Sequence, residues 1–177
     1  MVAWSSWRIW AAVRSFMGRR REIPLAMQRN SRCFIVPGLG NSGPDHWQTY
    51  LERRNPSFVR IQQREWNAPD RAEWVATIEQ ALAGEDLSQV VLVAHSLGCA
   101  AVAHWAMQHG RAIRAALLVA PADVEAAHFV GVPATGFAPM PQQRLPFASK
   151  VVASTTDEWV TPARAAQFAA AWGSQLV

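Results

Sequence analysis

The sequence of 177 residues has few cysteines, few charged residues and no long apolar run, and each shortage excludes a class of protein. Its two cysteines, Cys33 and Cys99, are too few for a disulfide-rich scaffold and lack the spacing of a metal site. We therefore expect them to be small core residues in a reducing, cytoplasmic setting. No stretch of about 18 apolar residues occurs, which argues against a transmembrane helix. A hydrophobic content of 50% with 17% charged residues excludes a largely disordered chain, and the length suits one domain.

The charge is unevenly distributed along the chain. Residues 1–32 contain seven arginines and one acidic residue, whereas residues 33–177 contain ten basic and twelve acidic residues. The sequence pI near 10.0 therefore comes from the first segment. Because the remainder is mildly acidic, we expect no nucleic-acid partner.

Residues 1–30 are predicted to be a basic, disordered leader that precedes a domain spanning residues 31–177. Tryptophans come before the Arg19-Arg20-Arg21 triplet, which is the reverse of the order in an export signal. On a helical wheel, Arg14 falls between Trp7 and Trp10 and interrupts the apolar face that a membrane-surface helix needs. Membrane contact by the leader is therefore not expected.

The domain is predicted to alternate short apolar strands with helices. Continuous apolar runs bounded by glycine or proline are typical of strands buried on both faces of a parallel sheet. Strands are expected at 33–36, 57–62, 89–94, 115–120 and 150–154, with a further strand beginning at 176. Helices are expected at 46–54, after an Asp45 cap, from Asp70 to about residue 82, at 97–108 and at 162–172. This order predicts an α/β fold of three layers, with helices on both faces of a mostly parallel sheet.

The sharpest motif is Ala94-His95-Ser96-Leu97-Gly98, placed where a buried strand turns into a helix. This is the context of the α/β-hydrolase nucleophile elbow, in which small residues two before and two after the serine permit a tight turn. The motif predicts Ser96 as a nucleophile. The backbone N–H of Leu97 would face the developing oxyanion, supported by the positive end of the helix. The glycine-rich loop after the first strand predicts Leu39 N–H as the second donor.

The acid of a catalytic triad should follow a later strand. Asp157, after the strand at 150–154, is the stronger candidate, and Asp123, after the strand at 115–120, is the rival. No histidine follows Asp157, although the chain order of the fold requires one there. His46 and His128 are the loop histidines that could act instead.

Three stretches resemble the small serine hydrolases of the YdeN and retinoblastoma-binding-protein-9-like family. They are the run from Cys33 to Trp47, including Gly-Asn-Ser-Gly-Pro-Asp-His-Trp at 40–47, the elbow through Cys99, and Ala153 to Asp157. The resemblance covers about residues 31–177. It implies an α/β-hydrolase with almost no cap, no cofactor or metal, and a Ser-Asp-His triad that includes Ser96 and Asp157.

The resemblance also implies a further strand and a Gly-His loop that this sequence does not contain. The expected function is therefore a serine hydrolase for small esters or amides, with activity lost if the histidine is missing. The alternative is a catalytically inactive hydrolase-fold module that binds a protein. The segment at 121–146, which contains five prolines, is the only loop long enough to shape a substrate pocket.

Overall fold

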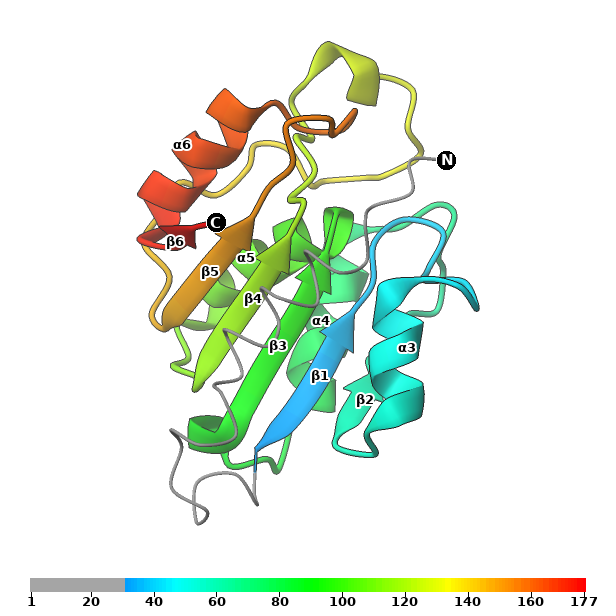
Figure 1. Cartoon of the computed structure of the whole chain (residues 1–177), viewed down its shortest axis with the longest axis vertical. Helices are drawn as coiled ribbons and strands as arrows, with labels where there is room; N and C mark the ends of the chain where they lie inside the picture. Colours follow the sequence, from blue (N-terminus) through cyan, green and yellow to red (C-terminus); the bar gives the residue numbers. More distant parts are fainter. Residues whose placement is uncertain (1–30) are drawn as a thin grey trace.

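The computed structural model describes residues 31–177, which form a single parallel sheet of six strands in the order β2-β1-β3-β4-β5-β6 (Figure 1). The leader predicted at residues 1–30 lies outside the described residues. The strands are β1 (Arg32–Val36), β2 (Phe58–Arg60), β3 (Val90–His95), β4 (Ala115–Val119), β5 (Ala148–Val152) and β6 (Gln175–Leu176). The helices are α3 (Trp47–Arg54), α4 (Arg71–Ala81), α5 (Leu97–His109) and α6 (Pro162–Trp172), with short 3-10 turns at Leu87–Gln89 and Ala127–Phe129.

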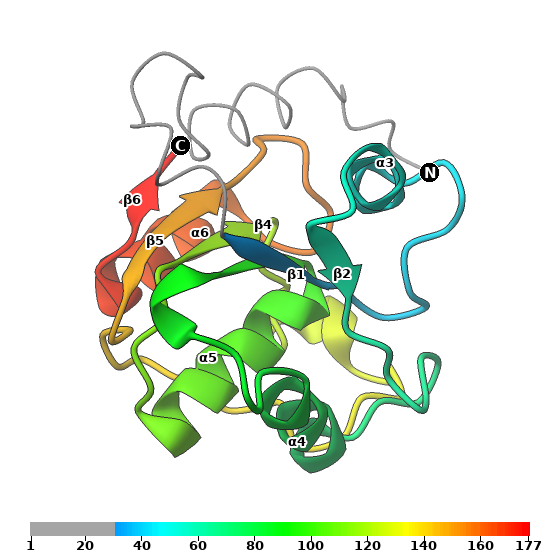
Figure 2. The ribbon, with the colours of Figure 1, turned by 90° about the horizontal axis from the view of Figure 1, so that it is seen from below.

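Helices cover both faces of the sheet, as the alternating pattern predicts. Helix α3 lies on one face, whereas α4 and α5 lie on the other (Figure 2). On the α3 face, Trp47 and Leu51 pack with inward residues of β1, β3 and β4, among them Ile35. On the opposite face, residues of α4, α5 and α6, including Trp105 and Trp172, form the larger core cluster. The α/β class predicted from the sequence is confirmed, and the site must lie at a strand end because both faces are covered.

Several element boundaries differ from the sequence prediction, and β2, for example, ends at Arg60 and not at residue 62. The side chain of His46, and not that of Asp45, caps α3, by accepting a hydrogen bond from Gln48 N–H. Strand β5 begins two residues earlier than predicted, and residues 153–154 belong to the following turn. Strand β6 begins at Gln175 and pairs with Lys150 and Val151 of β5, so β5 has a neighbour on each side.

The 121–146 segment is only partly a surface excursion. Phe137, Met140 and Leu145 are buried in the larger core cluster. A parallel bridge between Asp70 and Thr135 fastens its middle to the start of α4. Its first part, up to about Val130, is the portion free to border a site. None of the helices in residues 31–177 is long and apolar enough to cross a membrane.

Candidate active site

Ser96 stands at the carboxyl end of β3 in a backbone conformation that side-chain-bearing residues rarely adopt. Its φ of 51° and ψ of −124° turn the chain abruptly from β3 into α5. Its N–H donates to Val119 O of the neighbouring strand at 3.0 Å. Such strain of about 1–3 kcal/mol persists at functional sites because the surrounding structure enforces it. The predicted strand–turn–helix context of Ser96 is therefore present.

Two glycines permit the close packing around this turn, which we call the elbow (residues 94–98). A Cβ atom on Gly98 would lie 2.4 Å from Val36 O and 2.5 Å from Pro37 O, both backbone atoms. A Cβ atom on Gly38 would lie 2.9 Å from the Ser96 Cβ atom and 3.2 Å from Leu97 N. The glycine loop (residues 37–43) consequently lies directly against the nucleophile candidate.

Several backbone N–H groups at this junction, among them those of Leu39 and Leu97, have no hydrogen-bond partner within residues 31–177. In the glycine loop, Gly40 N–H donates to Trp66 O and Asn41 N–H donates to Gly38 O. The N–H groups of Leu39 and Leu97 have no such bond in the described part of the chain. Leu97 is the first residue of the 13-residue helix α5, where N–H groups are ordinarily unpaired and the helix dipole is positive. The amino end of α5 is therefore suited to bind a negatively charged group.

A polar network that the sequence did not reveal fixes the glycine loop. The Arg60 side chain, 7% exposed, donates to Asn41 Oδ1 and Ser42 O at 2.8 Å, and it pairs with Glu52. The fully buried Gln48 donates from Nε2 to Val93 O at 3.0 Å and accepts a hydrogen bond from Ser42 at 2.6 Å. The specific stretch at 40–47 is therefore held by residues of α3 and β2. Only the polarity of Gln48 within a helix that faces the core could have suggested this.

Asp157 lies in the turn after β5, at the same edge of the sheet as Ser96. Its Oδ1 accepts a hydrogen bond from Trp159 N–H at 2.8 Å. Partial burial raises the pKa of Asp157 above its ordinary value, although the Trp159 and Val160 N–H groups oppose that rise. The pKa of Cys99 is also raised, mainly because this thiol is buried and in part because of the charge of Asp157. Since Cys99 is in the first turn of α5, Asp157 is within electrostatic range of the elbow.

Asp123, the rival acid, is already paired. Its Oδ2 accepts a hydrogen bond from Arg164 Nε at 3.2 Å, and the same guanidinium binds Glu125. Its backbone N–H donates to Trp159 O at 2.9 Å, so it joins the turn after β4 to the turn after β5. This arrangement indicates a structural role for Asp123, which joins the turn after β4 to α6 and to the turn after β5.

Two histidines meet on the α3 side of the elbow. The rings of His46 and His95 are 4.7 Å apart, and the ring of Trp47 is 6.0 Å from that of His95. Burial lowers the pKa of His95 to about 3, with a contribution from His46. Burial and the Arg60 charge lower the pKa of His46 to about 4. Both rings are therefore neutral at pH 7, and the His95 ring lies with those of His46 and Trp47 on the α3 side of the elbow.

The other three histidines occupy different surroundings. Nε2 of the buried His104 lies 2.8 Å from Phe137 O, and His109 at the end of α5 lies 3.7 Å from Glu79. His128 is exposed, and its ring packs edge-on against Trp159 with 5.5 Å between centroids. The sequence gives no signal for this contact because the two residues come from different loops.

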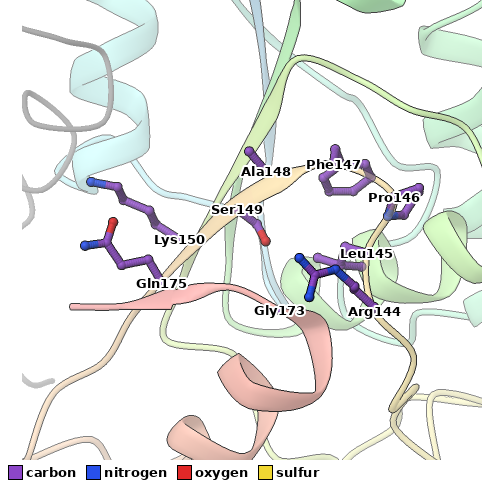
Figure 3. A pocket seen from close by; sticks show the side chains of 9 residues that line it. All are labelled: Arg144, Leu145, Pro146, Phe147, Ala148, Ser149, Lys150, Gly173 and Gln175. Atoms are coloured by element: carbon purple, nitrogen blue, oxygen red, sulfur yellow. The ribbon is translucent and has the colours of Figure 1, made fainter.

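No group of His, Cys, Asp or Glu side chains within residues 31–177 has the arrangement of a metal site. A separate hollow lies at the amino ends of β5 and β6, bordered by Arg144, Ser149, Lys150 and Gln175 (Figure 3). Ser96 is at the carboxyl end of β3, so this hollow is at the opposite edge of the sheet. It therefore does not belong to the candidate active site.

Solved structures with the same fold include several hydrolases. A protein of Pectobacterium atrosepticum described as a YdeN-like hydrolase is 32% identical, with a TM-score of 0.74 over 86% of this chain and 78% of that one. The ydeN gene product of B. subtilis is 19% identical, with a TM-score of 0.68 over 83% of each chain. Est1E of Butyrivibrio proteoclasticus, solved with ferulic acid, is 14% identical, with a TM-score of 0.60 over 90% of this chain and 82% of that one. The last two structures, at 19% and 14% identity, are evidence for a shared fold alone.

Comparison with curated proteins gave no match. The model of the serine hydrolase family, in contrast, matches residues 33–177, which is nearly all of the described chain. This match agrees with the strained serine, the two crowded glycines and the similarity to the YdeN-like hydrolase. The chain belongs to the serine hydrolase family, and within it to the small YdeN-like hydrolases.

Proposed function

We propose that this protein hydrolyses small esters or amides, with Ser96 as the nucleophile. The observation that carries the proposal is the left-handed backbone of Ser96 at the β3–α5 turn, packed against Gly38 and Gly98. A serine held in this way presents its hydroxyl at the carboxyl end of the sheet. Strained backbone of this kind is concentrated at active sites, which supports a catalytic role for the elbow motif.

The N–H groups of Leu39 and Leu97 are proposed to bind the oxyanion of the tetrahedral intermediate. Both lie at the junction of glycine loop and elbow, and neither donates to another protein group within residues 31–177. Donors that are fixed before the reaction stabilise the developing charge without reorganisation, and removal of one typically lowers kcat about 100-fold or more. The network around Arg60 and Gln48 is what keeps the Leu39 donor in place.

Asp157 is proposed as the acid that orients the catalytic base. It is preferred to Asp123 because Asp123 already binds Arg164, whereas the Asp157 carboxylate has only backbone N–H partners in the described chain. In the usual order of the fold a histidine follows this acid, and the sequence after Asp157 contains none.

A fluorophosphonate probe and p-nitrophenyl acetate test this function. Labelling of the chain and ester hydrolysis should both be lost in Ser96→Ala, because the residue that accepts the acyl or phosphonyl group is removed. Ser88→Ala is the matched control, since Ser88 is an exposed serine before β3 whose hydroxyl donates only to Asp86. Equal labelling of parent and Ser96→Ala would contradict the assignment. Absence of labelling in both would favour the alternative, a hydrolase-fold module that binds a protein partner.

A further inference from the structure

The two faces of the sheet are covered by unequal numbers of helices. Residues of α4, α5 and α6 belong to the larger core cluster on one face. On the other face, the described helices contribute Trp47 and Leu51 of α3 to the cluster. Helix α3 lies against β2, near one end of the strand order (Figure 2). The part of this face formed by β4 and β5 therefore has no helix from residues 31–177 over it.

Helix α3 is too small to cover the whole face. Its eight residues make a helix about 12 Å long and about 10 Å wide, whereas six strands at a spacing of about 4.8 Å form a sheet about 24 Å wide. Parallel sheets occur almost only with both faces covered. The side chains on the rest of this face fit that rule, since they are apolar and buried: Val91, Val93, Leu117, Val119 and Val152. A second apolar element is therefore required over β4 and β5.

Residues 8–17 have the spacing of an amphipathic helix. Arg8 and Arg14 fall outside the apolar stripe of that helix, which is distinct from the face that contains Trp7 and Trp10. Gly18 follows the last apolar residue, as glycine commonly does at the end of a helix. The apolar residues occupy positions i, i+3, i+4, i+7 and i+8, the pattern of a helix that packs on a core: Ile9, Ala12, Val13, Phe16 and Met17.

The chain between this stretch and β1 is long enough to place such a helix on the uncovered part of the face. Strand β1 begins at Arg32, and the centre of the β4–β5 pair lies about 12 Å from β1 across the sheet. Residues 18–30 can span about 40 Å when extended. A helix of ten residues is about 15 Å long, which is close to the length of about 17 Å of a five-residue strand such as β4.

We propose that residues 8–17 form a helix that packs across β4 and β5, on the face of the sheet that α3 covers in part. Its apolar stripe contacts the cluster around Leu117, Val119 and Val152, and its arginines remain in solvent. The inference is independent of the proposed function. For these residues it replaces the expectation of a disordered leader.

Two matched double variants of the full chain test whether the stripe packs on the domain. Val13→Asp/Phe16→Asp places two charges on the apolar stripe, and Ala11→Asp/Ser15→Asp places the same two charges on the opposite side of the helix. The first should lower the melting temperature by about 5 °C or more, because buried apolar side chains are replaced by charged ones. It should also increase the fluorescence of the apolar dye ANS, since the sheet face becomes exposed. The second should melt within about 1 °C of the parent.

A pair of conservative core substitutions tests which face the helix covers. Leu117 belongs to the cluster on the α3 face, whereas its neighbour Leu118 belongs to the larger cluster on the α5 face. Each is changed to valine in the parent and in Phe16→Ala, a variant mild enough to remain folded. Leu117→Val should lower the melting temperature by about 2 °C less in Phe16→Ala than in the parent, because residues in contact are not additive. Leu118→Val should have the same effect in both.

Four outcomes overturn the proposal. Equal melting temperatures of the two double variants would show that the stripe does not pack on the domain. Additive effects of Leu117→Val and Phe16→Ala would place the helix elsewhere. A parent dimer in sedimentation that both double variants retain would assign the face to a second copy of the chain. Binding of the parent to phosphatidylcholine–phosphatidylserine vesicles, lost in Val13→Asp/Phe16→Asp without a change in melting temperature, would assign the stripe to a lipid surface.

Discussion

The two sides of the candidate site are built differently. On the side of β1 and β3, the glycine loop and the elbow touch through backbone atoms and are held by the buried Gln48 and Arg60. On the side of β4 and β5, the 122–129 and 157–159 turns meet through exposed or half-buried groups such as Trp159, which is 43% exposed. The β1–β3 side is thus held by a dense buried network, whereas the β4–β5 side rests on a few surface contacts.

Because the two sides are built differently, we expect one to affect mainly the stability of the fold and the other mainly the catalytic activity. Oxyanion donors must be fixed before the reaction, which demands a dense network, and disruption of that network should unfold the protein. An acid and a base need the correct protonation state and orientation, and loops that a rigid scaffold positions commonly carry such residues. Substitutions that disrupt the network on the first side should therefore lower stability, whereas substitutions on the second side should act mainly on activity.

The largest expected effect on activity is at Asp157. Asp157→Asn should lower Ser96-dependent ester hydrolysis by about 10⁴-fold, as expected when the group that orients the base can no longer do so. Asp123→Asn should change the rate much less, because Asp123 binds Arg164. Steady-state kinetics on both variants make the comparison. A larger loss in Asp123→Asn would exchange the roles of the two acids.

Gly98→Ala should have the largest effect on stability. The added Cβ would lie 2.4 Å from Val36 O, and neither backbone can withdraw without separating β1 from the elbow. The free energy of unfolding should fall by about 3 kcal/mol. Urea denaturation measures this loss, with Gly43→Ala as the control because a Cβ there would have no neighbour within 4 Å. Equal stability of the two variants would show that the elbow can relax.

Gln48→Leu should cause an intermediate loss of stability. It leaves Val93 O without its side-chain donor and Ser42 Oγ without its acceptor inside the protein. Loss of these partners should reduce the free energy of unfolding by about 2 kcal/mol. Gln62→Leu, at an exposed position just after β2, is the matched control. A neutral result for Gln48→Leu would mean that the glycine loop does not depend on this network.

Ser96→Gly should produce a smaller change of the opposite sign. Glycine accepts the φ and ψ of Ser96 without strain, so the protein should gain about 1 kcal/mol of stability as it loses its nucleophile. Ser96→Ala retains the strained Cβ and should melt at the parent temperature. The difference in melting temperature between these two inactive variants isolates the strain. A Ser96→Gly variant no more stable than Ser96→Ala would show that the turn is relaxed.

The smallest effect concerns pH. Burial raises the pKa of Asp157 in the folded state, so its ionisation destabilises the fold. The stability associated with the protonated form is present below the unfolded pKa and is lost as the pH rises through the folded pKa. Asp157→Asn should therefore be more stable than the parent at neutral pH and equal to it at low pH. Melting curves across this range test the sign, and a stability deficit at neutral pH would contradict it.

Much of the fold could be predicted because its signals are local. Apolar runs identified β1, β3 and β4 to within one residue, and the start of α4 at Asp70 followed from residue type. Strand β5 was displaced by two residues, since Ala148 and Ser149 carry little strand preference of their own.

The candidate site was predictable only in part. The elbow is a contiguous motif, so Ser96 and its glycine could be identified directly. Contacts between distant residues, such as Arg60 with Ser42 and His128 with Trp159, leave no periodic trace in a single sequence. The role of Asp123 as the partner of Arg164 likewise required coordinates. The assignments of Ser96, Asp157, Leu39 and Leu97 are predictions, and the substitutions of Ser96 and Asp157 test the first two.

The strand order has a consequence for where a ligand can enter. From β1 the chain first moves outward to β2 and then returns past β1 to β3, so its winding direction reverses between β1 and β3. The connections on either side of this switch point run over opposite faces of the sheet, with α3 on one face and α4 on the other (Figure 2). In sheets that are wound in this way, ligands generally bind at the carboxyl edge beside the switch point. The glycine loop and Ser96 lie at that point, so the winding of the chain by itself predicts where a substrate would bind.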